Sequence, residues 1–288
     1  MPDIAFLTGD TAIARNDNHE RLPRAFREAG WQVTILPHEA MRLEPGGVRL
    51  GAQDPARFAL IWLVGMGRAD TFLDRMQLLR LLPPDRLVIG VHALTYGHAK
   101  YAWWRHMPET YASSDSEYLK SKLAQGGEWV AKPVAGSYGR DVVRVCNDSE
   151  GGAVLDRLTG GGETYCLLQR YVAQIESGEK RTLVAGGRII GSYLRLPGNG
   201  LRANLAAGGK PHPTSLTAGE RDLVEHLAGE FAAGGVGFAA VDTVFPYLME
   251  VNLANPGGLA TLESLYREDF TPAVVRAVCR WRGLPGSV

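Results

Sequence analysis

Residues 239–256 read AAVDTVFPYLMEVNLANP. Largely apolar segments lie on both sides of the central FPY, which predicts two antiparallel strands joined by a three-residue turn. Such a turn would place Asp242 opposite Glu250, and the alternation along a strand puts Asn252 on the same face as Glu250. Three oxygen-bearing side chains are therefore expected to converge on one side of a sheet.

This set of donors favours a metal site. Hard oxygen ligands without histidine or cysteine suit Mg²⁺, which takes one or two carboxylates together with substrate phosphates. We expect Asp242, Glu250 and Asn252 to hold Mg²⁺, with Mn²⁺ as an alternative ion. The other interpretation is an edge hairpin whose polar residues face water. The apolar segments Phe238–Val241 and Leu248–Val251 make it less favoured, because polar groups on a buried face need a partner.

Upstream of this region, two apolar segments meet at Gly186-Gly187, a dipeptide typical of a tight β-hairpin turn. Four side chains on this hairpin and on the glycine-rich stretch after it could bind phosphate or carboxylate: Arg181, Arg195, Arg202 and Asn204. Each of them alone is more often a surface residue. Their common approach to the predicted metal-bearing sheet favours a binding role.

A second candidate region lies earlier in the chain. Lys132 lies near the end of a predicted strand, shortly before the sequence GSYG at 136–139. Backbone N–H groups of such a loop, together with a lysine, can hold the phosphates of a nucleotide. The alternative is a glycine hairpin with an exposed lysine. Lys100, farther upstream, is typical of a surface lysine when considered alone.

The first hundred residues alternate strand and helix patterns, which predicts a parallel sheet. We expect a helix over Thr71–Leu82 and a last strand over Leu87–Val91. The sequence Gly65-Met66-Gly67 lacks the third glycine of a dinucleotide-binding turn, so dinucleotide binding is disfavoured.

The amino-acid composition excludes several classes of protein. Of the 288 residues, 45% are hydrophobic and 22% charged, as in globular proteins, and the formal net charge is zero, so neither nucleic acid nor an anionic membrane surface is an expected partner. The longest apolar run, residues 58–67, is about half the ~20 residues that span a bilayer. The N-terminus lacks the basic residues of a secretory signal, so we expect a cytoplasmic protein. Three cysteines without CxxC spacing argue against disulfides or a thiolate metal site.

Taken in order, these segments resemble the ATP-grasp superfamily, and specifically the prokaryotic glutathione synthetase family. The resemblance is sharpest over Gln169–Pro256, where QRYVAQIESGEKR, YLRLP, RANLAAGG and the stretch quoted first follow that family's order and spacing. It extends more weakly upstream through VAKPVAGSYGRDV and Ala99-Lys100-Tyr101. It implies an α/β fold of ATP-grasp architecture in three units: an N-terminal parallel-sheet unit (1–98), a small α+β lid (99–172) and a C-terminal antiparallel-sheet unit with the metal ligands (173–288).

The resemblance also implies roles for individual residues. ATP phosphates would be bound by Lys100 and Lys132 and covered by Gly136, Ser137, Tyr138 and Gly139. Adenine would meet the backbone of Gln169, Arg170, Tyr171 and Val172, and the ribose would meet Glu179. Arg181 would contact the transferring phosphoryl group, and Arg195, Arg202 and Asn204 would lie near phosphate and the acceptor. Asp242, Glu250 and Asn252 match the family's magnesium ligands.

The implied reaction activates a carboxylate with ATP to an acyl phosphate, which an amine converts to an amide. γ-Glutamylcysteine and glycine are the first candidate substrates. Two stretches depart from the family: residues 65–70 lack its basic, double-proline segment, and residues 254–258 lack its small hydroxyl residues. A ligase acting on another amino acid, peptide or protein terminus is therefore an alternative, as is a non-catalytic nucleotide-binding module. Oligomeric state stays open, and a homo-oligomer is compatible with the sequence.

Overall fold

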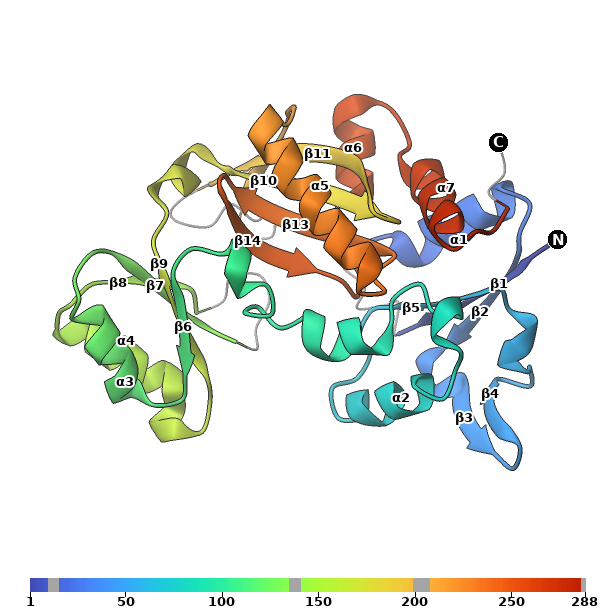
Figure 1. Cartoon of the computed structure of the whole chain (residues 1–288), viewed down its shortest axis with the longest axis horizontal. Helices are drawn as coiled ribbons and strands as arrows, with labels where there is room; N and C mark the ends of the chain where they lie inside the picture. Colours follow the sequence, from blue (N-terminus) through green and yellow to red (C-terminus); the bar gives the residue numbers. More distant parts are fainter. Residues whose placement is uncertain (10–15, 135–140, 199–207, 286–288) are drawn as a thin grey trace.

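The structure is a computed structural model that describes residues 1–9, 16–134, 141–198 and 208–285. Sheets of three, four and five strands carry the fold, and helices pack against them (Figure 1). Within these described ranges, no helix has the length and apolar character needed to cross a lipid bilayer.

The N-terminal sheet is parallel, with the order β2-β1-β5, as the sequence predicts. Its strands are β1 (Asp3–Thr8), β2 (Gln32–Pro37) and β5 (Leu60–Val64). Helix α1 (Asn18–Glu28) connects β1 to β2, and α2 (Phe72–Leu79) follows β5. All five residues of β5 are buried, which is the pattern of a parallel strand covered on both faces.

Two details of this unit differ from expectation. The strand predicted over Leu87–Val91 is absent, because Leu87 and Ile89 each make only one isolated bridge, to two different segments of the chain. A short hairpin of β3 (Met41–Glu44) and β4 (Gly47–Leu50) was not predicted. Strands of four residues offer too little alternation to be found by periodicity.

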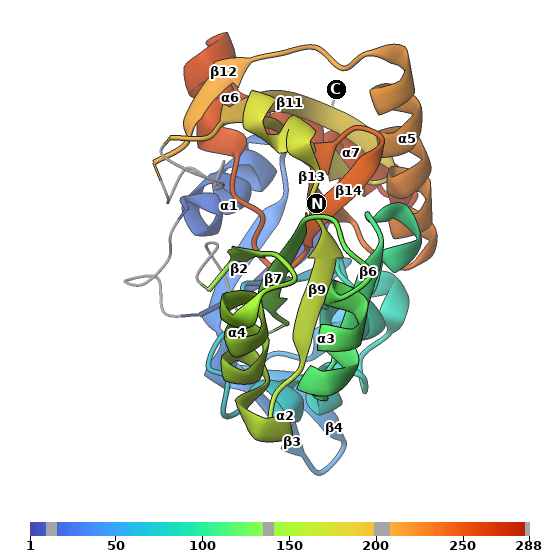
Figure 2. The same ribbon diagram turned by 90° about the vertical axis from the view of Figure 1, so that its left-hand side faces the viewer.

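The middle of the chain forms a separate four-stranded sheet in the order β6-β9-β7-β8. Its elements are β6 (Thr110–Ser113), α3 (Ser116–Leu123), β7 (Trp129–Pro133), β8 (Val143–Val145), α4 (Ser149–Thr159) and β9 (Cys166–Arg170). The two helices lie side by side on one face of the sheet (Figures 1 and 2). They enclose a small hydrophobic core of their own, which includes Leu119, Trp129, Leu155 and Leu168.

The C-terminal sheet is antiparallel, with the order β12-β11-β10-β13-β14. Its strands are β10 (Glu179–Ala185), β11 (Arg188–Leu196), β12 (Lys210–Pro213), β13 (Phe238–Val244) and β14 (Tyr247–Asn252). The helices of this unit are α5 (Ala218–Ala233), α6 (Leu259–Tyr266) and α7 (Thr271–Trp281). Figure 2 shows α5 on one side of the sheet and α6 on the other. The predicted Gly186-Gly187 hairpin is confirmed, and both glycines have the positive φ that this tight turn requires.

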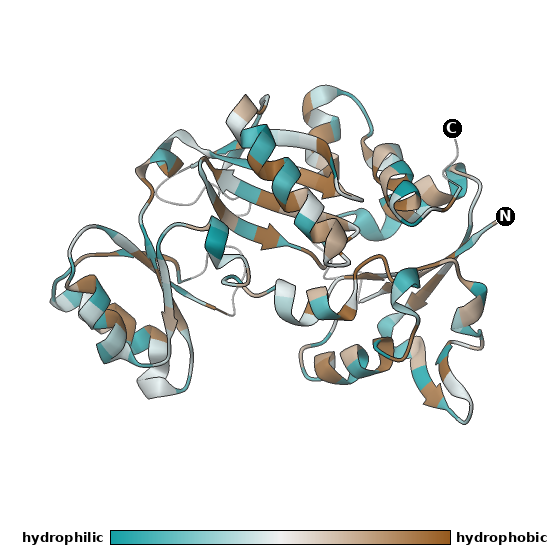
Figure 3. Ribbon diagram, viewed as in Figure 1, coloured by the Kyte–Doolittle hydropathy of each residue, from teal (hydrophilic) through white to brown (hydrophobic). Residues whose placement is uncertain are grey.

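One large core joins the N-terminal and C-terminal units. The rings of Trp62 on β5 and Phe238 on β13 meet edge to face, 5.8 Å apart. Hydrophobic residues concentrate in the strands of both sheets, whereas α5 alternates hydrophobic and hydrophilic residues (Figure 3). The first and last units thus form one packed body, and the middle sheet carries a core separate from it.

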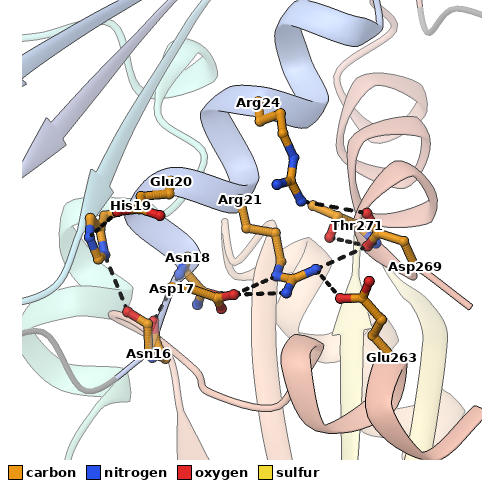
Figure 4. Close-up of polar contacts among 10 residues, drawn as sticks. All are labelled: Asn16, Asp17, Asn18, His19, Glu20, Arg21, Arg24, Glu263, Asp269 and Thr271. Carbon is orange, nitrogen blue, oxygen red and sulfur yellow. Dashed lines mark hydrogen bonds and ion pairs between the residues drawn. The ribbon is translucent and has the colours of Figure 1, made fainter. Parts of the chain in front are cut away.

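A buried arginine forms ion pairs between the N-terminal and C-terminal units (Figure 4). Arg21 on α1 is 8% exposed, and its guanidinium lies 2.7 Å from Asp17, 2.6 Å from Glu263 and 3.5 Å from Asp269. Hydrogen bonds to Asp17 and Glu263 raise the pKa of Arg21 against the opposing effect of burial, with Asp17 making the largest contribution. This ion-pair network fixes α1 against the segment that contains α6 and the start of α7.

Candidate active site

One row across the C-terminal sheet carries several of the predicted polar residues. Arg181 on β10 lies opposite Asp242 on β13, and Asp242 lies opposite Glu250 on β14. Tyr193 on β11 flanks Arg181 on the other side. Side chains directly opposite in a sheet start about 4.5–5.5 Å apart and share a face, so this row presents them together.

The register of this row is as the sequence predicts, but the turn behind it is different. The sequence predicts a three-residue turn, whereas β13 and β14 are joined by the two-residue turn Phe245-Pro246. Met249 is left without a partner, because the register shifts beside Asp242, and this bulge restores the pairing of Asp242 with Glu250. Bulges are common next to active sites, where they re-aim a side chain.

Four charged side chains form a buried network at this row. Arg181 donates two hydrogen bonds to Asp242, from Nε to Oδ1 and from Nη2 to Oδ2, each 2.7 Å long. Arg195 Nη2 lies 2.8 Å from Asp242 Oδ2 and 2.6 Å from Glu179 Oε1. Asp242 is 1% exposed and Arg195 3% exposed, so these contacts are shielded from water.

The network separates the pKa values of its two carboxyl groups. Burial would raise the pKa of Asp242, but Arg181 and Arg195 outweigh it and hold that pKa below its usual value. Burial, together with the charges of Asp242 and Glu250, raises the pKa of Glu179 to about 7 against the opposing charges of Arg195 and Arg181. Asp242 is therefore ionised at neutral pH, whereas the pKa of Glu179 lies close to neutral pH.

These contacts correct the reason for expecting a metal. The sequence argument holds that buried oxygens here need a cation, but two guanidinium groups already balance the charge of Asp242. The neighbouring side chains are different: within the described ranges the Glu250 carboxylate makes no ion pair, and Asn252 Nδ2 is buried without a hydrogen-bond partner. The metal-ligand atoms that Asp242, Glu250 and Asn252 offer are all oxygens, and oxygen ligands suit a hard divalent cation.

The two predicted phosphate-binding lysines lie near Glu250. Burial lowers the pKa of Lys132 to about 8 and also lowers the pKa of Lys100, and the charge of Glu250 opposes both shifts. Lys132 Nζ donates to Gln169 Oε1 at 3.0 Å, and Lys100 Nζ donates to the carbonyl oxygen of Pro133 at 3.1 Å. The charge of Glu250 therefore acts on two ammonium groups that come from different parts of the chain.

The low pKa of Lys132 leads to a prediction about pH. Only the protonated ammonium attracts phosphate, so the affinity for Mg²⁺-ATP is expected to fall as pH rises through about 8. Simple titration gives a decrease of about tenfold between pH 7 and pH 9. Calorimetric titration at several pH values checks this. Lys132→Arg is the matched control, because its guanidinium stays charged and its profile should be flatter. A wild-type affinity that is constant from pH 7 to 9.5 would contradict the role of Lys132.

The predicted adenine-binding segment lies at the end of β9. Gln169 is 2% exposed and its Nε2 donates to Thr110 Oγ1, which fixes the amide that accepts from Lys132. The N–H groups of Arg170 and Tyr171 donate to the carbonyl oxygens of Glu109 and Glu128. These two donors belong to the sheet, so contact with adenine through Gln169–Val172 would need other backbone groups and stays a prediction.

Several predicted residues lie outside the part of the chain that the structure describes. They are Gly136, Ser137, Tyr138, Gly139, Arg202 and Asn204. The structure brings together Arg181, Arg195, Glu179 and Asp242 by direct contact.

Sequence reasoning missed the contact that closes one side of this region. Asn18, at the start of α1, is 1% exposed and its Nδ2 donates to Asn255 Oδ1 at 2.8 Å and to the Pro256 carbonyl oxygen at 2.9 Å. Asn16 Nδ2 donates to the Asn255 carbonyl oxygen at 3.1 Å. The first turn of α1 therefore holds the loop that follows Asn252. No local pattern signals this, since the partners are more than 230 positions apart.

Solved structures define the class of fold. D-cycloserine synthetase DcsG superposes with a TM-score of 0.66 at 19% identity, covering 96% of this chain and 99% of that one. The ATP-grasp ligase PsnB, complexed with minimal precursor, Mg and ADP, gives 0.70 at 13% identity, covering 98% of each chain. At these identities the likeness concerns the fold alone, which is the ATP-grasp fold that the sequence predicts.

The profile described as "Prokaryotic glutathione synthetase, ATP-grasp domain" matches residues 99–267. The glutathione synthetase of Prochlorococcus marinus subsp. pastoris is 31% identical over 185 residues, which cover 64% of this chain and 58% of that protein. The glutathione synthetase of Parasynechococcus marenigrum is 30% identical over 286 residues, covering 95% and 87%. The chain belongs to the prokaryotic glutathione synthetase ATP-grasp family.

The extent of these matches differs among relatives. Besides the Prochlorococcus enzyme, the glutathione synthetase of Salmonella typhimurium is also matched over 58% of its own length. The family model, by contrast, has defined bounds, and residues 99–267 include Lys100, Lys132, Arg181, Arg195, Asp242 and Glu250.

Proposed function

We propose that the protein is an ATP- and divalent-metal-dependent ligase that joins a carboxylate to an amine through an acyl phosphate. The observation that carries this proposal is a pair of neighbouring carboxylates with cations around them: Arg181 and Arg195 contact Asp242, and the charge of its cross-strand neighbour Glu250 acts on Lys100 and Lys132. Such an arrangement suits transfer of a phosphoryl group, because that reaction needs positioning and charge neutralisation more than a protein nucleophile.

In this proposal each residue type has a distinct task. Lys132 and Lys100 bind the phosphates of ATP and hold them over β14. Asp242, Glu250 and Asn252 would hold a divalent cation, which would supply positive charge against the phosphates. Arg181 orients Asp242 through two hydrogen bonds, and its remaining guanidinium surface can face the transferred group. Arg195 holds Glu179 and Asp242 in fixed positions from the far side.

We propose γ-glutamylcysteine and glycine as the first substrate pair, with Mg²⁺ as the metal and residues 1–98, 99–172 and 173–288 as the three units. Family membership supports this pair. Residues 65–70 and 254–258 depart from the family as noted above, and Gly65 N donates to the carbonyl oxygen of Ala254, so the two departures are neighbours. A site built to hydrogen-bond one substrate rejects analogues that lack the matching group, so changes in such a region redirect specificity.

The direct test is phosphate release from Mg²⁺-ATP by the purified protein. γ-Glutamylcysteine plus glycine should raise the rate well above the ATP-only background, and mass spectrometry should detect glutathione. Omission of either substrate is the control. Release at no more than background would refute this pair, and a screen over amino acids and short γ- and α-peptides would then identify another amine or carboxylate.

The same screen distinguishes two possible functions, that of a ligase and that of a non-catalytic nucleotide-binding module. A ligase should bind Mg²⁺-ATP and release phosphate with at least one carboxylate and amine pair. A binding module should bind the nucleotide with no substrate-dependent turnover, and that result would refute the ligase proposal.

Asn18 provides a prediction that rests on this proposal. Asn18→Ala removes two hydrogen bonds to the loop at 255–256, and buried acceptors left without donors cost about 1–3 kcal/mol. We expect the KM of the amine or carboxylate substrate to rise while the affinity for Mg²⁺-ATP stays unchanged. Steady-state kinetics and nucleotide titration measure the two effects separately, with Glu20→Gln on the exposed side of α1 as control. An equal loss of nucleotide affinity would argue against a local role.

A further inference from the structure

Two histidines and a glutamate converge outside the candidate active site. His226 and Glu230 lie one helical turn apart on α5, and His106 lies in the 3₁₀ turn Trp104–His106 that precedes β6. His106 Nε2 is 3.1 Å from Glu230 Oε2, and His226 Nε2 is 3.5 Å from Glu230 Oε1. One ligand atom from each of the three residues lies within 4.8 Å of the others.

Two of these separations are close to those of a metal site. Bonds of about 2.0–2.1 Å from tetrahedral Zn²⁺ to nitrogen and oxygen separate neighbouring ligand atoms by about 3.3 Å. The nitrogen–oxygen distances, 3.1 Å to Oε2 and 3.5 Å to Oε1 of Glu230, lie on either side of this value. Two imidazoles and one carboxylate form a recognised ligand set for zinc, with a fourth position open to water.

The ligands come from elements that are already packed together. The rings of Trp103 and Phe231, which adjoin the site in the sequence, meet edge to face at 4.7 Å, and Trp103 Nε1 donates to the carbonyl oxygen of Gly97. A helix and a packed turn thus present the ligands, so little ordering is needed on binding. The site is reachable from solvent, with side-chain exposures of 20% for His106, 41% for Glu230 and 62% for His226.

We propose that His106, His226 and Glu230 form a binding site for a divalent transition metal, with Zn²⁺ as the ion of choice. This site differs in chemistry from the donors on β13 and β14, which are oxygen groups suited to Mg²⁺, whereas imidazole nitrogen favours zinc, copper and nickel. The metal links α5, which packs on the C-terminal sheet, to the segment that leads into β6 of the middle sheet. Its binding stabilises that junction because it holds the folded arrangement and not the unfolded chain.

Zinc titration of the full-length protein in excess Mg²⁺ tests the proposal. Cys146 is an exposed thiol, so every protein in the series carries Cys146→Ser. One equivalent of Zn²⁺ should bind saturably, and His226→Ala or Glu230→Gln should weaken this binding about tenfold or more. His212→Ala is the matched control, because His212 is an exposed histidine on β12 outside the cluster.

A second readout separates this site from zinc bound elsewhere. Zinc should raise the Tm of the parent protein and of His212→Ala, and it should leave the Tm of His226→Ala unchanged. Equal zinc affinity in the parent and in His226→Ala, or the absence of saturable binding in the parent, would overturn the proposal. Neither outcome bears on the proposed ligase reaction, since both measurements are made without ATP.

Discussion

Glu250→Gln is expected to abolish ATP-dependent turnover while leaving the fold intact. The substitution removes the negative charge that faces Lys100 and Lys132 and weakens any divalent cation at this strand end. Loss of one preorganised charge at a reacting centre costs about 10²–10³ in rate. Stability should change little, because the half-buried carboxylate makes no ion pair in the part of the chain that the structure describes. The measurement is phosphate release at saturating substrates over a range of Mg²⁺ concentrations.

Glu225→Gln is the matched control for this variant. Glu225 is an exposed residue of α5, and its nearest cation is Arg221 at 3.8 Å on the same helix. Its replacement should leave both turnover and the unfolding midpoint at wild-type values. If Glu250→Gln turned over at the wild-type rate under limiting Mg²⁺, the assignment of Glu250 to the metal would be wrong.

The elements that the sequence predicts well are those with long and regular patterns. The hairpin around Gly186-Gly187 is found because apolar segments and turn chemistry agree locally, and the strands β13 and β14 are found because both segments beside FPY are largely apolar. The pairing of Asp242 with Glu250 follows from them. The predicted pairing is correct although the predicted turn is one residue too long. The bulge at Met249 contains the extra residue, and this restores the register. A bulge depends on tertiary packing, and no local signal in the sequence indicates it.

The contacts that join distant parts of the chain are not predictable in this way. Arg21 reads as an ordinary helix arginine, yet it is buried between carboxylates that include Glu263 and Asp269 (Figure 4). Asn18 likewise reads as a helix-start residue. Periodicity describes which face of a helix is apolar, but it does not say which loop that helix will meet.

The two predicted metal carboxylates also differ in a way that the sequence cannot reveal. Strand alternation assigns both the same task, but Asp242 lies in a buried network with Arg181 and Arg195, whereas Glu250 is half-buried and makes no ion pair within the described ranges. Asp242 joins β13 to Arg181 on β10 and Arg195 on β11, so its charge stabilises the sheet. Glu250 can be changed with little effect on the fold, so the two positions should respond differently to substitution.

Asp242→Asn is therefore expected to lower the free energy of unfolding as well as activity. The amide cannot balance two guanidinium groups in a site that is 1% exposed, and removal of one partner from a buried ion pair costs about 3–5 kcal/mol. Urea denaturation should show a clearly lower midpoint for this variant than for wild type or Glu250→Gln. A midpoint equal to that of Glu250→Gln would contradict the structural role of the network.

A double variant tests whether uncompensated charge is the cause. Arg181→Met combined with Asp242→Asn removes one guanidinium together with the carboxylate, and Arg195 keeps its contact of 2.6 Å with Glu179. Replacement of both members of a buried pair is often nearly neutral, whereas loss of one member is costly. The double variant should thus unfold at a higher urea concentration than Asp242→Asn alone, while both remain inactive. If the two changes instead add to a greater loss of stability, packing of the Arg181 side chain, and not its charge, is what the sheet requires.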